Sequence, residues 1–175
     1  MSSLKVPVSE KDHRQGGDNN PDYTLVEYGD YECPHCRVAH PMVKRLERHF
    51  GDRLMFVFRN FPLTQIHPFA EAAAETAEFA AEHGVFWEMH DLLFQNQDRL
   101  GLPLLQELAS KLGLDSNQLT LDLEQGTYKP RIRADFTSGV LSGVNGTPTF
   151  FINGQRHNGP NEYSFLIEKL EKTSH

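Results

Sequence analysis

The two cysteines of this 175-residue chain, Cys33 and Cys36, lie close together in the segment Cys-Pro-His-Cys. The run from Thr24 to Tyr28 reads as a strand that ends shortly before this pair, and a pattern of helical period begins directly after Cys33. The free N–H groups of the first helical turn would then point at the Cys33 sulfur, and the helix dipole would lower the pKa of its thiol. We therefore expect Cys33 to be the attacking thiolate, and Cys36, one turn further along, to resolve the mixed disulfide.

Pro34 and His35 occupy the two positions between the cysteines. An imidazole or imidazolium of His35 that donates a hydrogen bond to the Cys33 sulfur would favour the thiolate, and hence the reduced form of the pair. A pair whose reduced form is stabilised is the stronger oxidant. These residue types therefore indicate a disulfide that passes readily to other thiols.

Other uses of a cysteine pair fit this chain less well. A structural disulfide across so short a loop would gain little chain entropy, and stable disulfides are rare in the cytoplasm. A zinc or iron-sulfur site needs four ligands; the chain has no second cysteine pair, and His35 and His40 do not easily complete the set. Covalent haem attachment requires a histidine directly after the second cysteine, where this chain has Arg37. We therefore expect no metal and no bound cofactor.

The elements that position the pair follow from the hydrophobic pattern. Apolar residues between Val38 and Phe50 repeat at helical spacing, with Pro41 inside the helix, where its ring should bend the axis. Leu54 to Arg59 form a second strand-like run, and a strand, a helix and a strand with this crossover predict a parallel βαβ unit. The residues of the helical repeat, whose charged neighbours should face away, are Val38, Met42, Val43, Leu46 and Phe50.

The second half of the chain changes character. Residues 66–142 carry almost no strand pattern and show several runs of helical spacing, which predict an inserted subdomain of four or five helices. After it, Thr149 to Ile152 reads as a strand, Asn153-Gly154 as a type I′ turn, and residues 155–158 as the returning strand of a hairpin. Residues 162–172 should form the last helix. The predicted order is βαβ, then helices, then ββα.

The ends and the charge of the chain limit its partners. We expect residues 1–22 to be a flexible lead, because Gly16 to Pro21 are mostly turn-forming residues, and residues 23–175 to be one domain. The lead is polar and lacks the apolar core of a secretory signal, which predicts a cytoplasmic protein. No apolar run approaches the roughly 20 residues that span a bilayer, so we expect no membrane partner. The net charge of −7 and the scattered Lys and Arg residues argue against nucleic acid.

The segment from Val26 to Cys36 resembles the active-site strand and helix start of DsbA-like proteins of the thioredoxin superfamily, in which Cys-Pro-His-Cys is the characteristic form. The resemblance runs from about Thr24 to Lys172 and includes the helical insertion. It implies an α/β thioredoxin fold, with βαβ and ββα halves around a central mixed sheet and an inserted helical subdomain. It also implies a protein disulfide oxidoreductase. The chain departs from the family at its N-terminus, because typical members are exported, and this leaves the direction of exchange open.

An acid and a proline near the cysteines match the family. Glu27 lies on the strand under the active site, where the superfamily keeps a buried acid. A buried carboxylate has a raised pKa, which suits a proton acceptor for the Cys36 thiol. Pro41 matches the proline that kinks the active-site helix.

A loop far along the chain also matches. Gly146 to Phe150 resembles the loop that holds the cis-proline of the family, so we expect the bond between Thr147 and Pro148 to be cis. A proline next to the reactive sulfur removes one N–H group, and the backbone of Thr147 would be free for strand-like pairing with an extended substrate.

Other side chains gave no clear role. Arg59 ends the second predicted strand, where it either approaches the active site or is a solvated strand end. The helical spacing of three aromatic residues and a methionine favours core packing over a substrate groove; these residues are Phe86, Trp87, Met89 and Phe94. The remaining histidines, His67 and His90 among them, are scattered, and we assign none of them a role.

Three functions use the pair differently. In the first, the chain is an enzyme that exchanges disulfides with protein or peptide thiols, with glutathione or a thioredoxin-type donor as redox partner. In a reducing cytosol the pair would rest largely as the dithiol, so oxidase, isomerase and reductase directions stay open. In the second, a redox-sensing or chaperone-like binding module uses the same dithiol. The third, a relative of the DsbA-fold glutathione transferases, is less favoured because that chemistry does not require a second cysteine.

Overall fold

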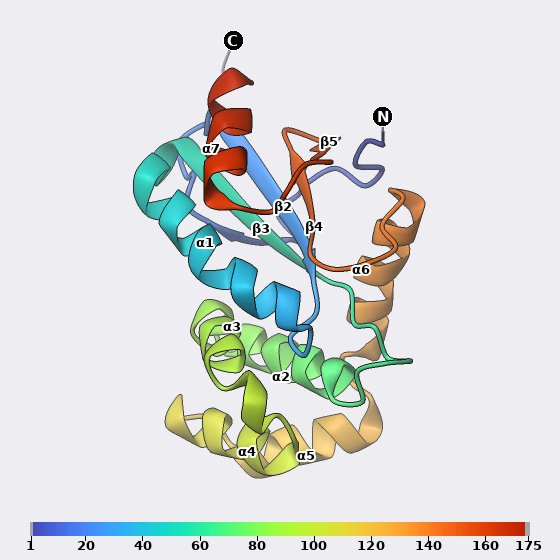
Figure 1. The fold of residues 1–175 in the computed structure, drawn as a ribbon. Helices are drawn as coiled ribbons and strands as arrows, with labels where there is room; N and C mark the ends of the chain where they lie inside the picture. Colours follow the sequence, from blue (N-terminus) through green and yellow to red (C-terminus); the bar gives the residue numbers. More distant parts are fainter. Residues whose placement is uncertain (1, 174–175) are drawn as a thin grey trace.

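The centre of the molecule is a mixed five-stranded sheet, in a computed structural model that describes residues 2–173 (Figure 1). Its strands are β1 (His13–Gln15), β2 (Tyr23–Gly29), β3 (Leu54–Asn60), β4 (Thr149–Ile152) and β5 (Gln155–Arg156). They are ordered β1-β3-β2-β4-β5 across the sheet. β2 and β3 pair in parallel, and the other neighbours are antiparallel, as the predicted fold requires.

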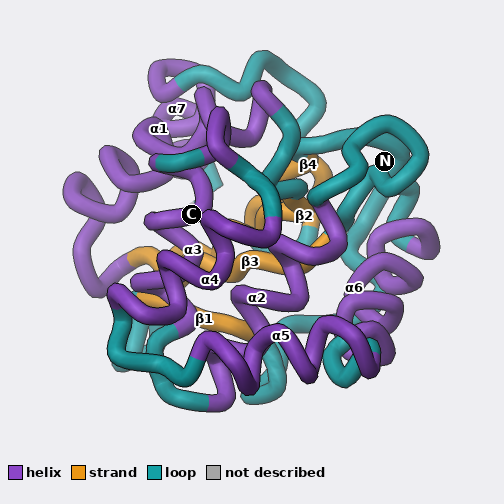
Figure 2. Tube along the Cα trace, turned by 90° about the horizontal axis from the view of Figure 1, so that it is seen from below, coloured by secondary structure: helices purple, strands orange, loops and turns teal. Residues whose placement is uncertain are grey.

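Helices cover both faces of the sheet and extend beyond one end of it (Figures 1 and 2). α1 (Pro34–Phe50) and α7 (Tyr163–Lys172) lie on one face, and α6 (Lys129–Leu141) lies on the other. The remaining α-helices are α2 (Ala70–Glu82), α3 (Phe86–Gln95), α4 (Leu102–Lys111) and α5 (Ser116–Gln125). The insertion therefore consists of five helices, α2 to α6, which confirms the inserted helical subdomain. No helix among residues 2–173 has both the length and the apolar character needed to cross a membrane.

Helix α1 carries the cysteine pair, and its buried face lacks two of the predicted residues, Met42, which is partly buried, and Val38. The helix ends where Gly51 adopts a φ of 56°, as the sequence indicates. The predicted repeat begins at Val38, but this side chain is 74% exposed. The face that packs on the sheet instead comprises Cys36, Ala39, Val43, Leu46 and Phe50. Val38 lies about 100° around the helix from Ala39, so it falls outside this stripe.

The central strand β2 is buried on both faces, which explains its nearly continuous apolar run. Leu25 belongs to the core under α1, whereas Val26 and Tyr28 belong to a second cluster on the α6 face. Helix α6 approaches closely at Gly139, where an added Cβ would lie 2.8 Å from ring carbons of Phe61. The glycine therefore allows α6 to pack against this face of the sheet.

The first residues of the chain do not form the loose lead that the sequence predicts. β1 pairs antiparallel with β3, and Ser3 forms a bridge with Gln155 at the opposite edge. Gly16 and Gly17 have positive φ angles of 75° and 67°, and an added Cβ at either position would lie 2.7 Å from atoms of β3. The turn-forming residues thus bring the chain against the edge of β3, whose N–H and C=O groups need partners.

Arg59, at the end of β3, occupies neither of the predicted environments. Arg59 is 2% exposed, and its guanidinium lies on the α6 face of the sheet. Nε donates a hydrogen bond to Asp12 Oδ1 at 2.8 Å, and a terminal nitrogen donates to the Tyr28 hydroxyl at 2.8 Å. The side chain anchors the N-terminal segment rather than reaching the cysteines, because successive side chains of a strand point to opposite faces.

The C-terminal hairpin follows the prediction closely. Asn153 and Gly154 have φ angles of 48° and 83°, as a type I′ turn requires. The returning strand β5 is shorter than the predicted 155–158, since only two residues pair with β4. The aromatic and methionine residues of α3 also pack as expected, with Phe86, Met89 and Phe94 buried in the core.

Candidate functional site

The two cysteines lie at the point where β2 has ended and α1 begins. Cys33 is the N-cap residue of α1, and its carbonyl oxygen accepts a hydrogen bond from the Arg37 N–H at 3.1 Å. Both thiols are free and buried, with Cys33 4% exposed and Cys36 fully covered. Pro34 is the first residue of the helix and, like His35, it is exposed. The predicted placement of the pair at a helix N-terminus is therefore correct.

The environment lowers the pKa of the Cys33 thiol to about 5. The largest cause is the hydrogen bond from the Cys36 side chain, which outweighs the opposing effect of burial. Hydrogen bonds from the backbone N–H groups of Cys36 and His35 lower the pKa further. Part of the effect of His35 on the Cys33 pKa therefore comes from its backbone N–H, which any residue except proline would supply.

The second thiol behaves in the opposite way. Burial raises the pKa of Cys36 well above its usual value, and its hydrogen bond to Cys33 and the negative charge of Glu27 raise it further. At neutral pH Cys33 is therefore a thiolate, while Cys36 keeps its proton. This is the division that an attacking thiol and a resolving thiol need.

Glu27 is a buried acid on the face of β2 that packs against α1. It is 3% exposed, and burial, followed by the negative charge of Cys33, raises its pKa to about 8. The carboxylate packs against Gly29, where an added Cβ would lie 2.8 Å from Glu27 Oε2 and 2.5 Å from the ring of Phe58. An acid with this pKa can accept or release a proton near neutral pH.

The loop before β4 meets the reactive sulfur. The bond between Thr147 and Pro148 is cis, as predicted. Cys33 Sγ lies 3.6 Å from the Thr147 carbonyl oxygen, and both loop residues are partly exposed. The Thr149 hydroxyl donates to the Gly146 carbonyl at 2.7 Å and ties the loop to the start of β4. The structure thus brings together Cys33, Cys36, Glu27, Thr147 and Pro148.

Sequence reasoning missed Asp30, which organises the turn before Cys33. Asp30 is 1% exposed, and its carbonyl oxygen accepts the Cys33 N–H at 3.1 Å. Its carboxylate accepts the N–H groups of Glu32 at 2.7 Å and Leu63 at 2.9 Å, and it lies 2.7 Å from Nδ1 of His67. A polar residue directly after a buried strand was the available signal, because loops at strand ends commonly carry functional groups.

Gln97 was missed as well. Its side-chain amide donates to the carbonyl oxygens of Tyr31 at 2.9 Å and Cys33 at 2.8 Å. Gln97 belongs to the helical insertion, so this contact ties the insertion to the active-site turn. Nothing in its sequence surroundings marks it as different from other polar loop residues.

One group of side chains among residues 2–173 could offer three ligand atoms to a metal ion, and it comprises His40, His90 and Asp91. Lys44 Nζ lies 3.2 Å from the same Asp91 oxygen that lies 3.3 Å from His40 Nε2. A fixed ammonium group at this position disfavours a second cation. For this reason we do not interpret the group as a metal site. Neither cysteine belongs to it.

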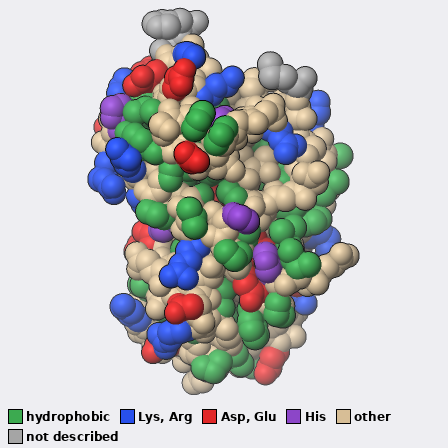
Figure 3. All heavy atoms as spheres, in the orientation of Figure 1, with side chains coloured by type: hydrophobic (Ala, Val, Ile, Leu, Met, Phe, Trp, Pro, Cys, Tyr) green, Lys and Arg blue, Asp and Glu red, His purple; other side chains and the backbone are tan. Residues whose placement is uncertain are grey.

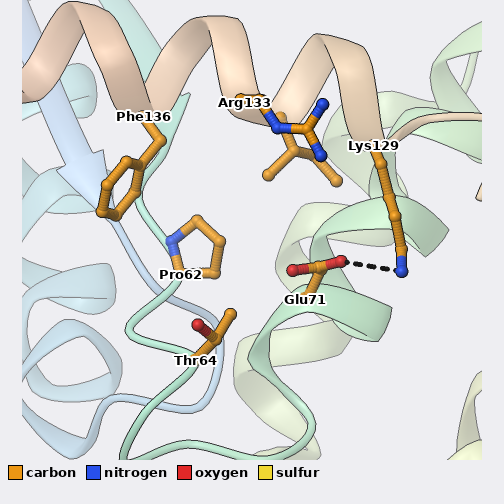
Figure 4. A pocket seen from close by; sticks show the side chains of 7 residues that line it. Pro62, Thr64, Glu71, Lys129, Arg133 and Phe136 are labelled. Atoms are coloured by element: carbon orange, nitrogen blue, oxygen red, sulfur yellow. Dashed lines mark ion pairs between the residues drawn. The ribbon is translucent and has the colours of Figure 1, made fainter.

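A separate cavity of about 170 Å³ lies between α6 and the loop after β3 (Figure 4). Glu71 and Lys129 form an ion pair of 3.3 Å at one side of it, and Pro62 and Phe136 lie at the other. Neither cysteine lines this cavity. It is therefore distinct from the thiol site.

Hydrophobic side chains are exposed in segments next to the cysteines. Figure 3 shows hydrophobic side chains and histidines near the middle of one face, with Lys, Arg and acidic side chains distributed among and around them. Three exposed hydrophobic residues belong to segments next to the pair: Val38 on α1, and Ile66 and Phe69 in the loop before α2. Phe69 N–H donates to Glu32 at 2.7 Å, which holds this loop against the active-site turn.

Comparison with protein families finds a match to the thioredoxin family model over residues 9–172. A Na(+)/H(+) antiporter NhaA 3 from Salinispora tropica is 46% identical over 158 residues, which are 90% of this chain and 24% of the antiporter. The chain spans about a quarter of the length of the curated relatives that it matches.

Solved structures match along almost the whole chain. Oxidised BdbD from Bacillus subtilis superposes with a TM-score of 0.88 at 23% identity, covering 99% of this chain and 98% of BdbD. The α-DsbA1 protein of Wolbachia pipientis superposes with a TM-score of 0.83 at 20% identity, covering 98% and 94%. At these identities the likeness concerns the fold, and it includes the helical insertion.

Proposed function

Because this chain belongs to the thioredoxin family and has the fold of the BdbD and α-DsbA1 structures, we propose that it is a DsbA-like protein disulfide oxidoreductase acting through Cys33 and Cys36. The observation that carries the proposal is the opposite displacement of the two thiol pKa values at one helix N-terminus. A low pKa makes Cys33 both a thiolate at neutral pH and a good leaving group. The raised pKa of Cys36 keeps it protonated until the mixed disulfide has formed.

In the oxidising direction, a substrate thiolate attacks Cys33 Sγ and breaks the bond between the two cysteines. The electron pair of that bond leaves on Cys36, which takes a proton from Glu27. A second substrate thiolate then attacks the substrate sulfur of the mixed disulfide and releases Cys33 as a thiolate. The substrate loses two electrons and the cysteine pair gains two. The reducing direction runs through the same steps backwards.

The low pKa of Cys33 supports the oxidising direction. A thiolate stabilised in the reduced protein makes the disulfide form the stronger oxidant. In our proposal the hydrogen bond from the Cys36 thiol supplies the largest part of this stabilisation, and the backbone N–H groups after Cys33 and the imidazole of His35 add to it. Pro34 starts the helix that presents these groups.

Protein or peptide thiols are the proposed substrates. The Thr147 carbonyl and the partly exposed Pro148 form the edge against which an extended chain would lie next to Cys33. Glutathione or a thioredoxin-type protein is the proposed redox partner. The cytoplasmic location stays a prediction.

The antiporter names of the relatives describe proteins about four times as long as this chain. Ion transport requires segments that span the bilayer, and none of the helices described in this chain could do so. We propose that the segment shared with those antiporters performs thiol chemistry rather than ion transport.

The test is turnover with a reduced peptide that forms one intramolecular disulfide, together with the equilibrium of the pair in glutathione buffers. Cys33→Ser should abolish turnover, and Cys36→Ser, given the same peptide in its disulfide form, should trap a mixed disulfide on Cys33. If the wild type shows no turnover and Cys33→Ser still binds its partner, the redox-sensing or chaperone-like module is favoured. Full activity in Cys36→Ser would favour glutathione-transferase chemistry.

A further inference from the structure

We propose that His67, held by Asp30 beside the active-site turn, supplies the imidazolium charge that stabilises the Cys33 thiolate. The inference rests on the proposed function, because it concerns the same reactive sulfur. It gives a role to a histidine outside the Cys-Pro-His-Cys motif. His67 is a positioning residue in this role: it acts through the negative charge on the Cys33 sulfur and does not contact the substrate.

The position of His67 is determined by hydrogen bonds rather than by loop flexibility. Its Nδ1 lies 2.7 Å from Asp30 Oδ2, and the Asp30 side chain is fully buried. The same Asp30 oxygen accepts the Leu63 N–H at 2.9 Å, and Glu32 accepts the Phe69 N–H at 2.7 Å. These bonds hold both ends of the loop that contains His67.

Asp30 also connects this loop to the reactive residue. Its carbonyl oxygen accepts the Cys33 N–H at 3.1 Å, so one residue contacts both His67 and Cys33. A hydrogen bond from Nδ1 to a carboxylate orients an imidazole and favours its protonated form. The His67 side chain keeps 17% exposure, which leaves the ring able to exchange protons with solvent.

Three negatively charged groups act electrostatically on His67: Asp30, the Cys33 thiolate and Glu32. Burial lowers the pKa of His67, but the hydrogen bond to Asp30 and the charges of these three groups raise it to above its usual value. Since coupling between two charges is reciprocal, a Cys33 thiolate that favours protonated His67 must itself be favoured by that proton.

A simpler role is that His67 only partners the buried carboxylate of Asp30. The two roles differ in how His67 responds to the redox state, since oxidation removes the Cys33 charge and leaves Asp30 unchanged. The imidazole signals of wild-type His67, followed by NMR against pH, report this response directly. We expect the pKa of His67 to be about half a unit or more higher in the reduced than in the oxidised protein. Equal values in the two forms would overturn the proposal.

Variants give a second measurement. His67→Gln keeps a hydrogen-bond donor for Asp30 but carries no charge, and we expect it to lower the ratio of thiolate to thiol at Cys33 by about threefold to tenfold. His67→Lys, which retains a positive charge, should restore much of that ratio. The matched control is His83→Gln at the exposed C-cap of α2, where the ring lies against Phe79. A Cys33 pKa that is the same in all four proteins would contradict the inference.

These outcomes separate the inference from the proposed function. If the expected shifts occur but the wild type turns over no peptide disulfide, the thiolate partner stands and the enzymatic proposal fails. If turnover occurs and His67 does not respond to the redox state, the enzymatic proposal stands and the role of His67 fails. The NMR titration uses the wild-type protein, so it decides the matter even where a variant does not fold.

Discussion

Cys33 Sγ lies 3.6 Å from the carbonyl oxygen of Thr147, although the two residues are 114 positions apart in the chain. The register of the sheet sets this contact, because Tyr28 on β2 pairs with Thr149 on β4. The strand that leads into the cysteine turn and the strand that follows the cis-proline loop are therefore neighbours, and their adjoining loops meet at the reactive sulfur.

Cys33 should react with iodoacetamide as a thiolate well below neutral pH. Its pKa of about 5 predicts that the rate falls to half only near pH 5, whereas an ordinary cysteine reaches half its maximum near pH 9. The measurement is the alkylation rate against pH in Cys36→Ala, which removes the side-chain donor, and in the reduced wild type. Because the largest cause of the low pKa is the bond from Cys36, the variant should show a higher Cys33 pKa than the wild type.

The same shift affects stability with a defined sign. A thiol whose folded pKa is lowered contributes stability that is present above its unfolded pKa of 9.0 and is lost as the pH falls through about 5. The free energy of unfolding of the reduced protein should therefore decrease relative to that of the oxidised protein as the pH falls from about 9 to about 5. A difference between the two forms that stays constant over this range would contradict the low pKa.

Glu27→Gln should change how stability depends on pH. The Glu27 carboxyl loses its proton near pH 4.5 when unfolded and near pH 8 when folded, so between these values the folded protein holds the extra proton. The free energy of unfolding of the wild type should therefore fall as the pH rises through this window. The variant should lack about 2 kcal/mol or more of that fall. Urea denaturation of oxidised proteins at pH 5 and pH 8 measures it, with Glu82→Gln on the surface as the control.

Glu27→Gln should also slow the reducing direction, in which the Cys36 thiol attacks the mixed disulfide, because Cys36 then lacks its proton acceptor. In rapid-mixing experiments the mixed disulfide on Cys33 should persist longer than in the wild type at neutral pH. An unchanged lifetime would remove Glu27 from the proposed proton path while leaving its buried position intact.

Gly139→Ala should destabilise the protein by about 1–3 kcal/mol. The added methyl group would lie 2.8 Å from the Phe61 ring and 3.0 Å from the Tyr28 ring, so α6 or the rings must move. Gly146→Ala is the matched control, since an added Cβ there meets nothing within 4 Å. Chemical denaturation compares the two variants, and equal stabilities would mean that α6 can shift at little cost.

Asp12→Asn should destabilise the protein by about 2–4 kcal/mol, because it leaves the Arg59 charge buried without its partner. Combining it with Arg59→Met removes both charges and should recover part of the loss. Hydrogen exchange should show β1 opening more often in the single variant than in the wild type. A double variant less stable than the single one would mean that Arg59 is held mainly by Tyr28.

The sequence by itself determined the local features of the site. The spacing of Cys33 and Cys36 and the change from strand to helical period placed the pair at a helix N-terminus, because hydrophobic periodicity is a property of neighbouring residues. The insertion and the hairpin turn at Asn153-Gly154 could be read in the same way. The cis bond before Pro148 and the buried acid at Glu27 came from family resemblance, since no local pattern specifies them.

Only the tertiary structure decided which residues surround the pair. The Asp30 and His67 contact, the pairing of β1 with β3 and the burial of Arg59 each join segments that are distant in sequence. Their sequence surroundings look like ordinary turns, loops and strand ends. What distinguishes them is a buried polar group that must find a partner somewhere in the fold, and that partner depends on how the whole chain packs.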